Sequence, residues 1–209
     1  MAEDFLGMSV RDFAAATADK TPTPGGGSVA GAVGMLAVAL GEMSLNFTRG
    51  KKKFAEHEPF HAHLAGRMEK ARALFADLVA DDVAAYSYYQ ETSRLPDGPE
   101  KHAAQQTATA AAIAVPREAT TLALAVLEDL AALSDKCNPY LITDLVAAGV
   151  LAVAVTQLSD LNVRVNVPSL DDKQAADDLR KASRDDIARA REWLVKIEQV
   201  GDAILGSSQ

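Results

Sequence analysis

The sequence is poor in cysteine, in aromatic residues and in positive charge, and each shortage excludes a class of protein. A single cysteine, Cys137, cannot form a disulfide within the chain. Aromatic residues make up only 5% and apolar residues 48%, a balance that favours close-packed helices over a sandwich of strands. The formal net charge of −8 argues against nucleic acid as a partner, because phosphate binding needs clustered positive charge.

The sequence also lacks an uninterrupted apolar run of membrane-spanning length. The two longest apolar stretches, residues 29–45 and 141–158, are interrupted by Glu42 and by Asp144 and are rich in glycine and alanine. We therefore expect them to be buried helices of a bundle, with no membrane partner. The first residues, MAEDFLGMSV, carry acids where a secretory signal carries a basic region, so a soluble, cytoplasmic protein is expected.

Helical periodicity runs through almost the whole chain, and no segment alternates over the length of a strand. We expect Ser9 and Ser28 to cap the first two helices and Pro116 to break or bend a later one. The predicted helices cover about residues 9–18, 28–48, 59–93, 101–133, 140–158 and 172–200. The sequence thus predicts an all-α fold, a single multihelical bundle with apolar, buried central helices and one domain over residues 1–209.

One short motif is typical of zinc enzymes but does not predict a metal here. The residues from His57 to His61 read HEPFH and fit the pattern H-E-x-x-H. Zinc binding needs both histidines one turn apart on a continuous helix, together with a third ligand. Pro59 lies inside the motif and marks a helix start, and His63 would point elsewhere. We therefore predict no metal site.

A glycine-rich turn precedes the second predicted helix, in the stretch TPTPGGGSVAG at residues 21–31. Successive backbone N–H groups in such a turn can form a concave site for an anion or another ligand. The alternative is a simple helix start capped by Ser28. The residues that raise this choice are Gly25, Gly26, Gly27 and Ser28.

The motifs that follow the glycine turn resemble those of one protein family. The chain contains, in order, NFTRGKKKF from residue 46, DDVAAY from 81, LP at 95, VP at 115, Asn138 with TD at 143, and NVRVN from 162. This order, with the preceding PGGGS, resembles the formiminotransferase-cyclodeaminase C-terminal family, which includes stand-alone methenyltetrahydrofolate cyclohydrolases. The resemblance covers nearly the whole chain. It departs near Gln105, where the family tends to have an arginine in the same helix.

The resemblance implies an all-helical homodimer that takes a tetrahydrofolate derivative as substrate and needs no tightly bound cofactor. Lysine ammonium groups can meet the carboxylates of the folate glutamate tail, or they can simply cap a helix end. Asparagine amides can pair with the pterin edge, or they can serve turns and caps. The residues assigned to substrate binding, besides the glycine turn, are Lys51, Lys52, Lys53, Asn138, Asn162 and Asn166.

The cyclohydrolase reaction needs a base for water and a proton for the departing nitrogen, and one carboxylate can supply both. Asp144 is one candidate because it lies inside an apolar run that should desolvate it, although it can also be a helix-start carboxylate. Asp82 is the second candidate, with Tyr86 one turn later, although it can be a solvated acid.

The resemblance leaves two enzymatic activities and one non-enzymatic role open. Because the chain shows no formiminotransferase portion, a methenyltetrahydrofolate cyclohydrolase is favoured over a formiminotetrahydrofolate cyclodeaminase that releases ammonia. A non-catalytic helical module that binds folate or a protein partner is the alternative of another class.

Overall fold

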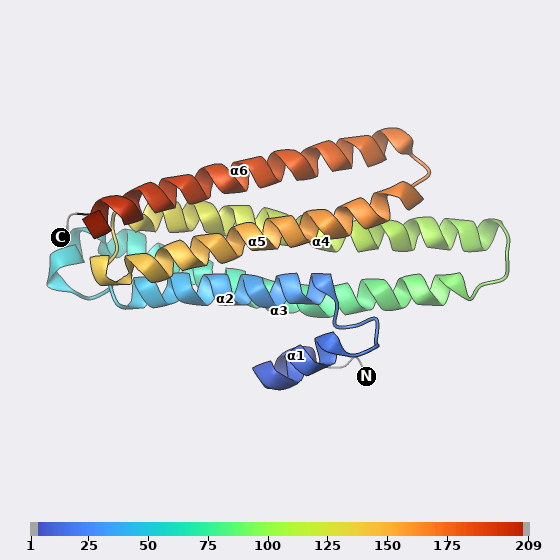
Figure 1. Cartoon of the computed structure of the whole chain (residues 1–209), viewed down its shortest axis with the longest axis horizontal. Helices are drawn as coiled ribbons and strands as arrows, with labels where there is room; N and C mark the ends of the chain where they lie inside the picture. The colour runs from blue at the N-terminus through green and yellow to red at the C-terminus, as the bar shows by residue number, and fades with distance from the viewer. Residues whose placement is uncertain (1–3, 207–209) are drawn as a thin grey trace.

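The computed structural model describes residues 4–206, and within them every regular element is helical (Figure 1). The long helices are α1 (Val10–Ala18), α2 (Gly26–Asn46), α3 (Glu58–Ser93), α4 (Pro99–Ser134), α5 (Ile142–Asn166) and α6 (Lys173–Gly206). Short 3₁₀ turns are η1 (Phe5–Gly7), η2 (Lys52–His57), η3 (Pro139–Leu141) and η4 (Val167–Ser169). The predicted all-α class is therefore confirmed, while a single domain over residues 1–209 stays a prediction.

The five longest helices form one elongated bundle, and α1 lies beside it (Figure 1). Helix α2 packs against both α3 and α5, and α6 covers α4 and α5 on the other side. Helices α2 and α5 run antiparallel: Ser44 Oγ donates to the carbonyl of Leu141 at 3.3 Å, whereas Gly26 lies beside Asn162. The core between the helices is made of fully buried aliphatic side chains together with Phe75.

The predicted helix starts and lengths needed three corrections. Gly25, not Ser28, is the N-cap of α2, because Ser28 lies in the first turn and turns its hydroxyl toward α3. Helix α5 continues past the predicted end at residue 158, and the buried Asp160 there accepts a hydrogen bond from Ser183 of α6. Helix α4 runs unbroken through Pro116. Proline removes an N–H, and the carbonyl of Ala112 instead accepts from Asn166 Nδ2 at 3.5 Å.

Glycines allow α2 to approach α3 closely. A Cβ added at Gly31 would lie 2.6 Å from Val79 Cγ2, and one added at Gly34 would collide with the ring of Phe75. Both glycines are buried, so no solvent space can take up an added methyl group. Gly31 and Gly34 therefore let the two helices approach at this contact.

The central helices are apolar, as predicted, but only partly buried. By length and composition alone, α2, α4 and the segment Pro139–Ser169 could each cross a membrane, and about half of each apolar window is buried in the bundle. The lone Cys137 is buried at the end of α4, and burial raises the pKa of its thiol to about 11. A thiol with a raised pKa carries little thiolate at neutral pH, which disfavours Cys137 as a nucleophile.

The close α2–α3 contact predicts opposite effects for two Gly→Ala changes. Gly34→Ala should lower the free energy of unfolding by about 1–3 kcal/mol, or roughly 2–12 °C in melting temperature, because Phe75 must move. Gly66→Ala, on α3 with nothing near the added Cβ, should raise the free energy of unfolding by about 0.4–1 kcal/mol. Thermal denaturation of both variants checks this, and equal melting temperatures would contradict the contact.

Candidate functional site

The glycine turn and Asp82 lie together at the N-terminal end of α2. Ser28 Oγ donates a hydrogen bond of 2.7 Å to Asp82 Oδ2, which joins α2 to α3. A Cβ added at Gly27 would collide with the Asp82 carboxylate, so only glycine lets this carboxylate lie against the helix start. The other carboxylate oxygen, Oδ1, accepts no hydrogen bond among the described residues. The turn is thus more than a helix start, because it seats a half-buried carboxylate.

Two of the predicted asparagines lie at the same end, on successive turns of α5. Asn162 Nδ2 donates to the carbonyl of Leu158 at 3.1 Å, and a Cβ at Gly26 would lie 3.8 Å from that amide. Its Oδ1 accepts no hydrogen bond from the described residues, so Asn162 can offer an acceptor beside the glycine turn. Asn166 has a structural role instead, because its Nδ2 donates to two backbone carbonyls, that of Asn162 at 2.8 Å and that of Ala112 at 3.5 Å.

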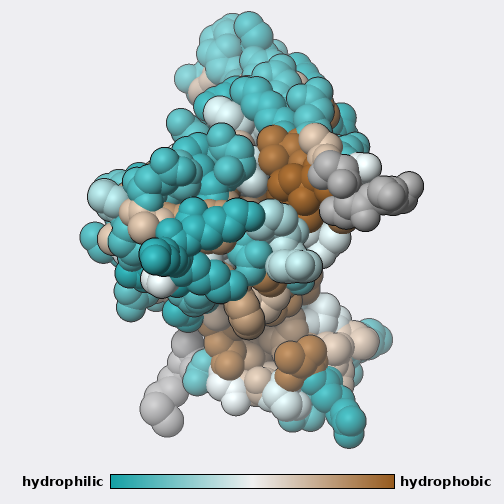
Figure 2. Space-filling view, turned by 90° about the vertical axis from the view of Figure 1, so that its left-hand side faces the viewer, coloured by the Kyte–Doolittle hydropathy of each residue, from teal (hydrophilic) through white to brown (hydrophobic). Residues whose placement is uncertain are grey.

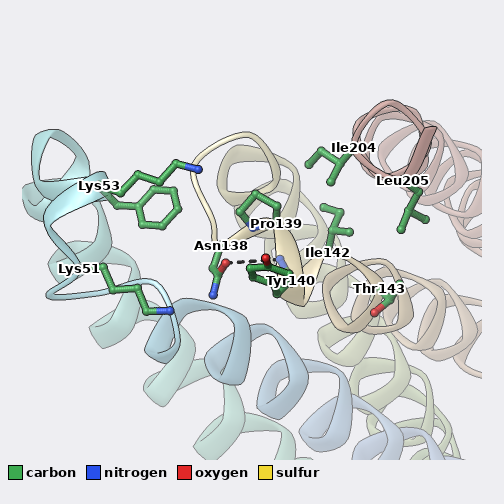
Figure 3. Close-up of a pocket in the computed structure, with 10 residues that line it drawn as sticks. Lys51, Lys53, Asn138, Pro139, Tyr140, Ile142, Thr143, Ile204 and Leu205 are labelled. Atoms are coloured by element: carbon green, nitrogen blue, oxygen red, sulfur yellow. Dashed lines mark hydrogen bonds between the residues drawn. The ribbon is translucent and has the colours of Figure 1, made fainter. Parts of the chain in front are cut away.

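A second group of predicted residues lines a pocket at the opposite end of α2 (Figure 3). The pocket has a volume of about 580 Å³. Lys51 and Lys53 reach it from the chain before and within η2, whereas Lys52 does not line it. No acid among residues 4–206 forms an ion pair with any of the three lysines. The pocket is lined by Lys51, Lys53, Phe54, Asn138, Pro139, Tyr140, Ile142, Thr143, Ile204 and Leu205.

Asn138 has a structural role at the lysine pocket. Its Oδ1 accepts from the backbone N–H of Tyr140 at 3.4 Å and so caps η3, as the dashed line in Figure 3 shows. Its Nδ2 donates to the carbonyl of Phe47 at 3.5 Å, and its backbone N–H donates to Thr48 Oγ1 at 2.8 Å. Asn138 therefore serves as a cap, which was the alternative to binding the pterin. Its hydrogen bonds also hold the connection between α4 and α5 against the end of α2.

Asp144 lies at the lysine end, next to Thr143 in the first turn of α5. The apolar run around it does not bury it fully, because the carboxylate is half-buried at the helix start. An acid in a first turn is stabilised by the helix dipole, so Asp144 can also be a helix-start carboxylate with no catalytic role. Among the described residues its carboxylate has no hydrogen-bond or ion-pair partner, unlike that of Asp82.

Apart from Lys52 and Asn166, the predicted site residues fall into two groups, and Ser159 and Tyr140, which were not predicted, lie with them. We call the group of Gly25, Gly26, Gly27, Ser28, Asp82, Ser159 and Asn162 the glycine end, and the group of Lys51, Lys53, Asn138, Tyr140, Thr143 and Asp144 the lysine end. Helix α2 separates them, and its 21 residues span about 30 Å. One folded chain cannot bring both candidate carboxylates to the same reacting atom.

The zinc-like motif has a structural explanation. Pro59 lies in the first turn of α3, as predicted, and His57 lies before that helix. His61 is buried, with Nε2 at 3.0 Å from the carbonyl oxygen of Lys136. Within residues 4–206 no three histidine, cysteine or acidic side chains gather as a metal site would require.

Sequence reasoning missed two residues of these groups. Ser159 is fully buried at the glycine end, one turn before Asn162, and its only signal was its place three residues ahead of that asparagine in an apolar helix. Tyr140 lines the lysine pocket and is 91% exposed, a feature that a sequence cannot show.

Comparisons with known proteins agree with the motifs. A family model described as formiminotransferase-cyclodeaminase matches residues 9–185. A methenyltetrahydrofolate cyclohydrolase of Methylorubrum extorquens is 30% identical over 83% of this chain and 86% of its own length. A formimidoyltransferase-cyclodeaminase of Mus musculus is 30% identical over 81% of this chain, which spans only 32% of that protein.

A solved structure shares the fold of this chain. The crystal structure of a formiminotetrahydrofolate cyclodeaminase from Thermotoga maritima superposes with a TM-score of 0.87 at 27% identity, covering 95% of this chain and 98% of that one. The resemblance found in the sequence is thereby confirmed over most of the bundle. The chain belongs to the formiminotransferase-cyclodeaminase family.

Proposed function

We propose that this chain is a soluble, cytoplasmic methenyltetrahydrofolate cyclohydrolase of one-carbon metabolism, with no tightly bound cofactor. The observation that carries the proposal is the Asp82 carboxylate, held by Ser28 through Oδ2 and open at Oδ1 beside the glycine turn. The name of the Methylorubrum extorquens relative, which the chain covers over most of its length, supports the same reaction. The substrate is 5,10-methenyltetrahydrofolate and the product is 10-formyltetrahydrofolate.

The reaction requires one carboxylate that can accept and return a proton. Water attacks the electrophilic carbon that joins N5 and N10, and Asp82 Oδ1 accepts one of its protons. The C–N5 bond then breaks as the C=O bond of the formyl group forms, and N5 is protonated. Over the whole reaction the cation and water give a neutral formyl compound and one released proton. The hydrogen bond from Ser28 keeps the carboxylate in place throughout.

A formiminotetrahydrofolate cyclodeaminase is the second candidate, and the solved Thermotoga maritima structure favours it. In that reaction N10 attacks the formimino carbon and ammonia leaves, so the same carboxylate can move the proton but no water reacts. The two activities are separated by the substrate consumed and by ammonia release.

Two acid-to-amide changes distinguish Asp82 from Asp144 as the candidate base. Asp82→Asn should lower kcat for methenyltetrahydrofolate hydrolysis by about 10²-fold or more, because an amide cannot accept a proton. Asp144→Asn should have the smaller effect, because Asp144 lies at the other end of α2 and lacks a positioning partner. The near-ultraviolet absorbance of the methenyl compound follows both reactions directly.

The matched control is Asp81→Asn, an exposed neighbour on α3 that should leave turnover unchanged. If Asp144→Asn abolishes turnover and Asp82→Asn does not, the base lies at the lysine end. Ammonia release from formiminotetrahydrofolate, with no hydrolysis of the methenyl compound, would replace the proposed activity with the cyclodeaminase. A folded protein that accelerates neither reaction would leave only a binding role.

We further propose that the chain is a homodimer through the exposed faces of α2 and α5. Helix α2 carries a single charged residue, Glu42, and Arg72 of α3 pairs with it at 2.7 Å. Figure 2, a view onto the lysine end, shows separate hydrophobic patches among hydrophilic surface at this end of the molecule. The large exposed apolar residues of the two helices are Leu36, Val150, Leu161 and Val165, with Phe47 just after α2. We infer that these residues form one apolar face that a second chain covers.

A two-fold axis perpendicular to the helices gives this dimer a functional consequence. Leu36 is ten residues from Gly26 and ten from Asn46, or about 15 Å from either end of α2. An axis near Leu36 brings the glycine end of one chain to the lysine end of its partner. The end that carries Asp82 then faces the end that carries Lys51 and Lys53, with the substrate between them, whereas a parallel arrangement places lysines against lysines.

In the proposed dimer each substrate lies between the two chains. The glycine end of one chain holds the reacting part, and the uncompensated lysines of the other meet the carboxylates of the glutamate tail. This arrangement explains why one sequence carries both motifs although α2 keeps them about 30 Å apart.

The dimer predicts that one charge on the apolar face abolishes both assembly and turnover. Leu36→Glu should give a monomer in sedimentation equilibrium, because Leu36 is 59% exposed in the chain and would bury its charge at the interface. Leu74→Glu, 51% exposed on α3 and outside the face, should keep the dimer and the activity. An active monomer, or a Leu36→Glu protein that still dimerises, would contradict the proposed interface.

A further inference from the structure

Ser159 is an unexplained polar residue in the glycine end. Its side chain is fully buried, and its Oγ has no hydrogen-bond partner among the described residues. The other buried serines all donate: Ser44 and Ser134 to carbonyls of the preceding turn, and Ser28 and Ser183 to carboxylates. A buried hydroxyl without a partner is costly, so a partner outside the protein is expected at this position.

The surroundings of Ser159 indicate what that partner is. Ser159 lines a small cavity together with the backbone of Gly27 and the side chains of Asp82 and Asn162. The volume of the cavity is about 10 Å³, which is close to the minimum for one water molecule. The remaining lining is apolar: Ala30, Gly31, Leu78, Val115, Pro116 and Ala119. Three polar groups in an apolar wall match the two to four partners of a buried water.

The hydrogen bonds already made by these side chains leave the right groups free. Asp82 uses Oδ2 to accept from Ser28, so Oδ1 remains as an acceptor, and it lies against Gly27, where a Cβ would collide with it. Asn162 uses Nδ2 to donate to Leu158, so its Oδ1 remains as a second acceptor. Ser159 remains as a donor. One donor and two acceptors satisfy both hydrogens and one lone pair of a single water.

We propose that Ser159 positions the water that is consumed in the hydrolysis, an inference that rests on the proposed cyclohydrolase function. Ser159 donates to one lone pair of the water, and Asp82 Oδ1 and Asn162 Oδ1 accept its two protons. The second lone pair is left for the bond to the bridging carbon. As that bond forms, the proton on the Asp82 side passes to the carboxylate. Ser159 is a positioning residue that exchanges no proton and forms no covalent bond.

The test separates kcat from KM and from stability. Ser159→Ala should lower kcat for methenyltetrahydrofolate about 10–100-fold with KM changed less than about twofold, because the water and not the folate loses its contact. Its melting temperature should stay within about 2 °C of the parent, because no hydrogen bond within the protein is lost.

Ser134→Ala is the matched control. Ser134 is a buried serine near the end of α4 whose Oγ donates to the carbonyl of Ala131 at 2.8 Å. It lies about 27 Å along α4 from Pro116, which lines the cavity. This change should lower the melting temperature by about 2–4 °C and leave kcat unchanged.

A crystal structure of the parent protein adds a readout that does not depend on activity. One ordered water should lie within hydrogen-bond distance of Ser159 Oγ and Asp82 Oδ1, and it should be lost in Ser159→Ala. A dry cavity in the parent would overturn the water site, whether or not the protein is active. An unchanged kcat in Ser159→Ala, with an active parent, would overturn the positioning role. An inactive parent that holds the water would contradict the cyclohydrolase proposal and the positioning role, but not the water site.

Discussion

The close approach of α2 to α3 is the constraint on which the rest of the structure depends. Gly27, Gly31 and Gly34 lie on one face of α2, and a Cβ at each would meet Asp82, Val79 or Phe75 of α3. The spacing of four and three residues keeps the three on one side of a helix. The same stripe therefore packs the core at one end and, at the other, lets Ser28 reach Asp82. The same row of glycines thus determines both the packing of the core and the position of the candidate base Asp82.

The fold was predictable because it depends on periodicity and composition, which a sequence displays. The predicted ends of α2 and α5 were less accurate because the partners are distant in the chain. Ser28 follows the prolines and glycines as an N-cap would, but its hydroxyl bonds Asp82, 54 residues away. Pro116 predicts a break or bend, yet the helix continues. The side-chain amide of Asn166 donates to the carbonyl of Ala112, which Pro116 leaves without a partner in the helix. Neither long-range pair leaves a local signal.

The candidate site was predictable as a set of residues but not as an arrangement. The resemblance named Lys51 and Asp82 together, whereas α2 places about 30 Å between their ends of the bundle. Asn138 and Asn166 were expected at a pterin edge, and backbone groups occupy their amides instead. Ser159 became visible only through its burial without a partner. The two ends and the apolar face between them are explained together if two chains complete each site.

Complementation between two inactive variants tests that central claim most directly. One parent carries Asp82→Asn, and the other replaces Lys51 and Lys53 with alanine. If each site combines the glycine end of one chain with the lysine end of the other, a mixed dimer has one intact site. Random exchange of equal amounts after mild denaturation should then restore about a quarter of the wild-type activity per chain. Activity no greater than the average of the two parents would contradict a site shared between chains.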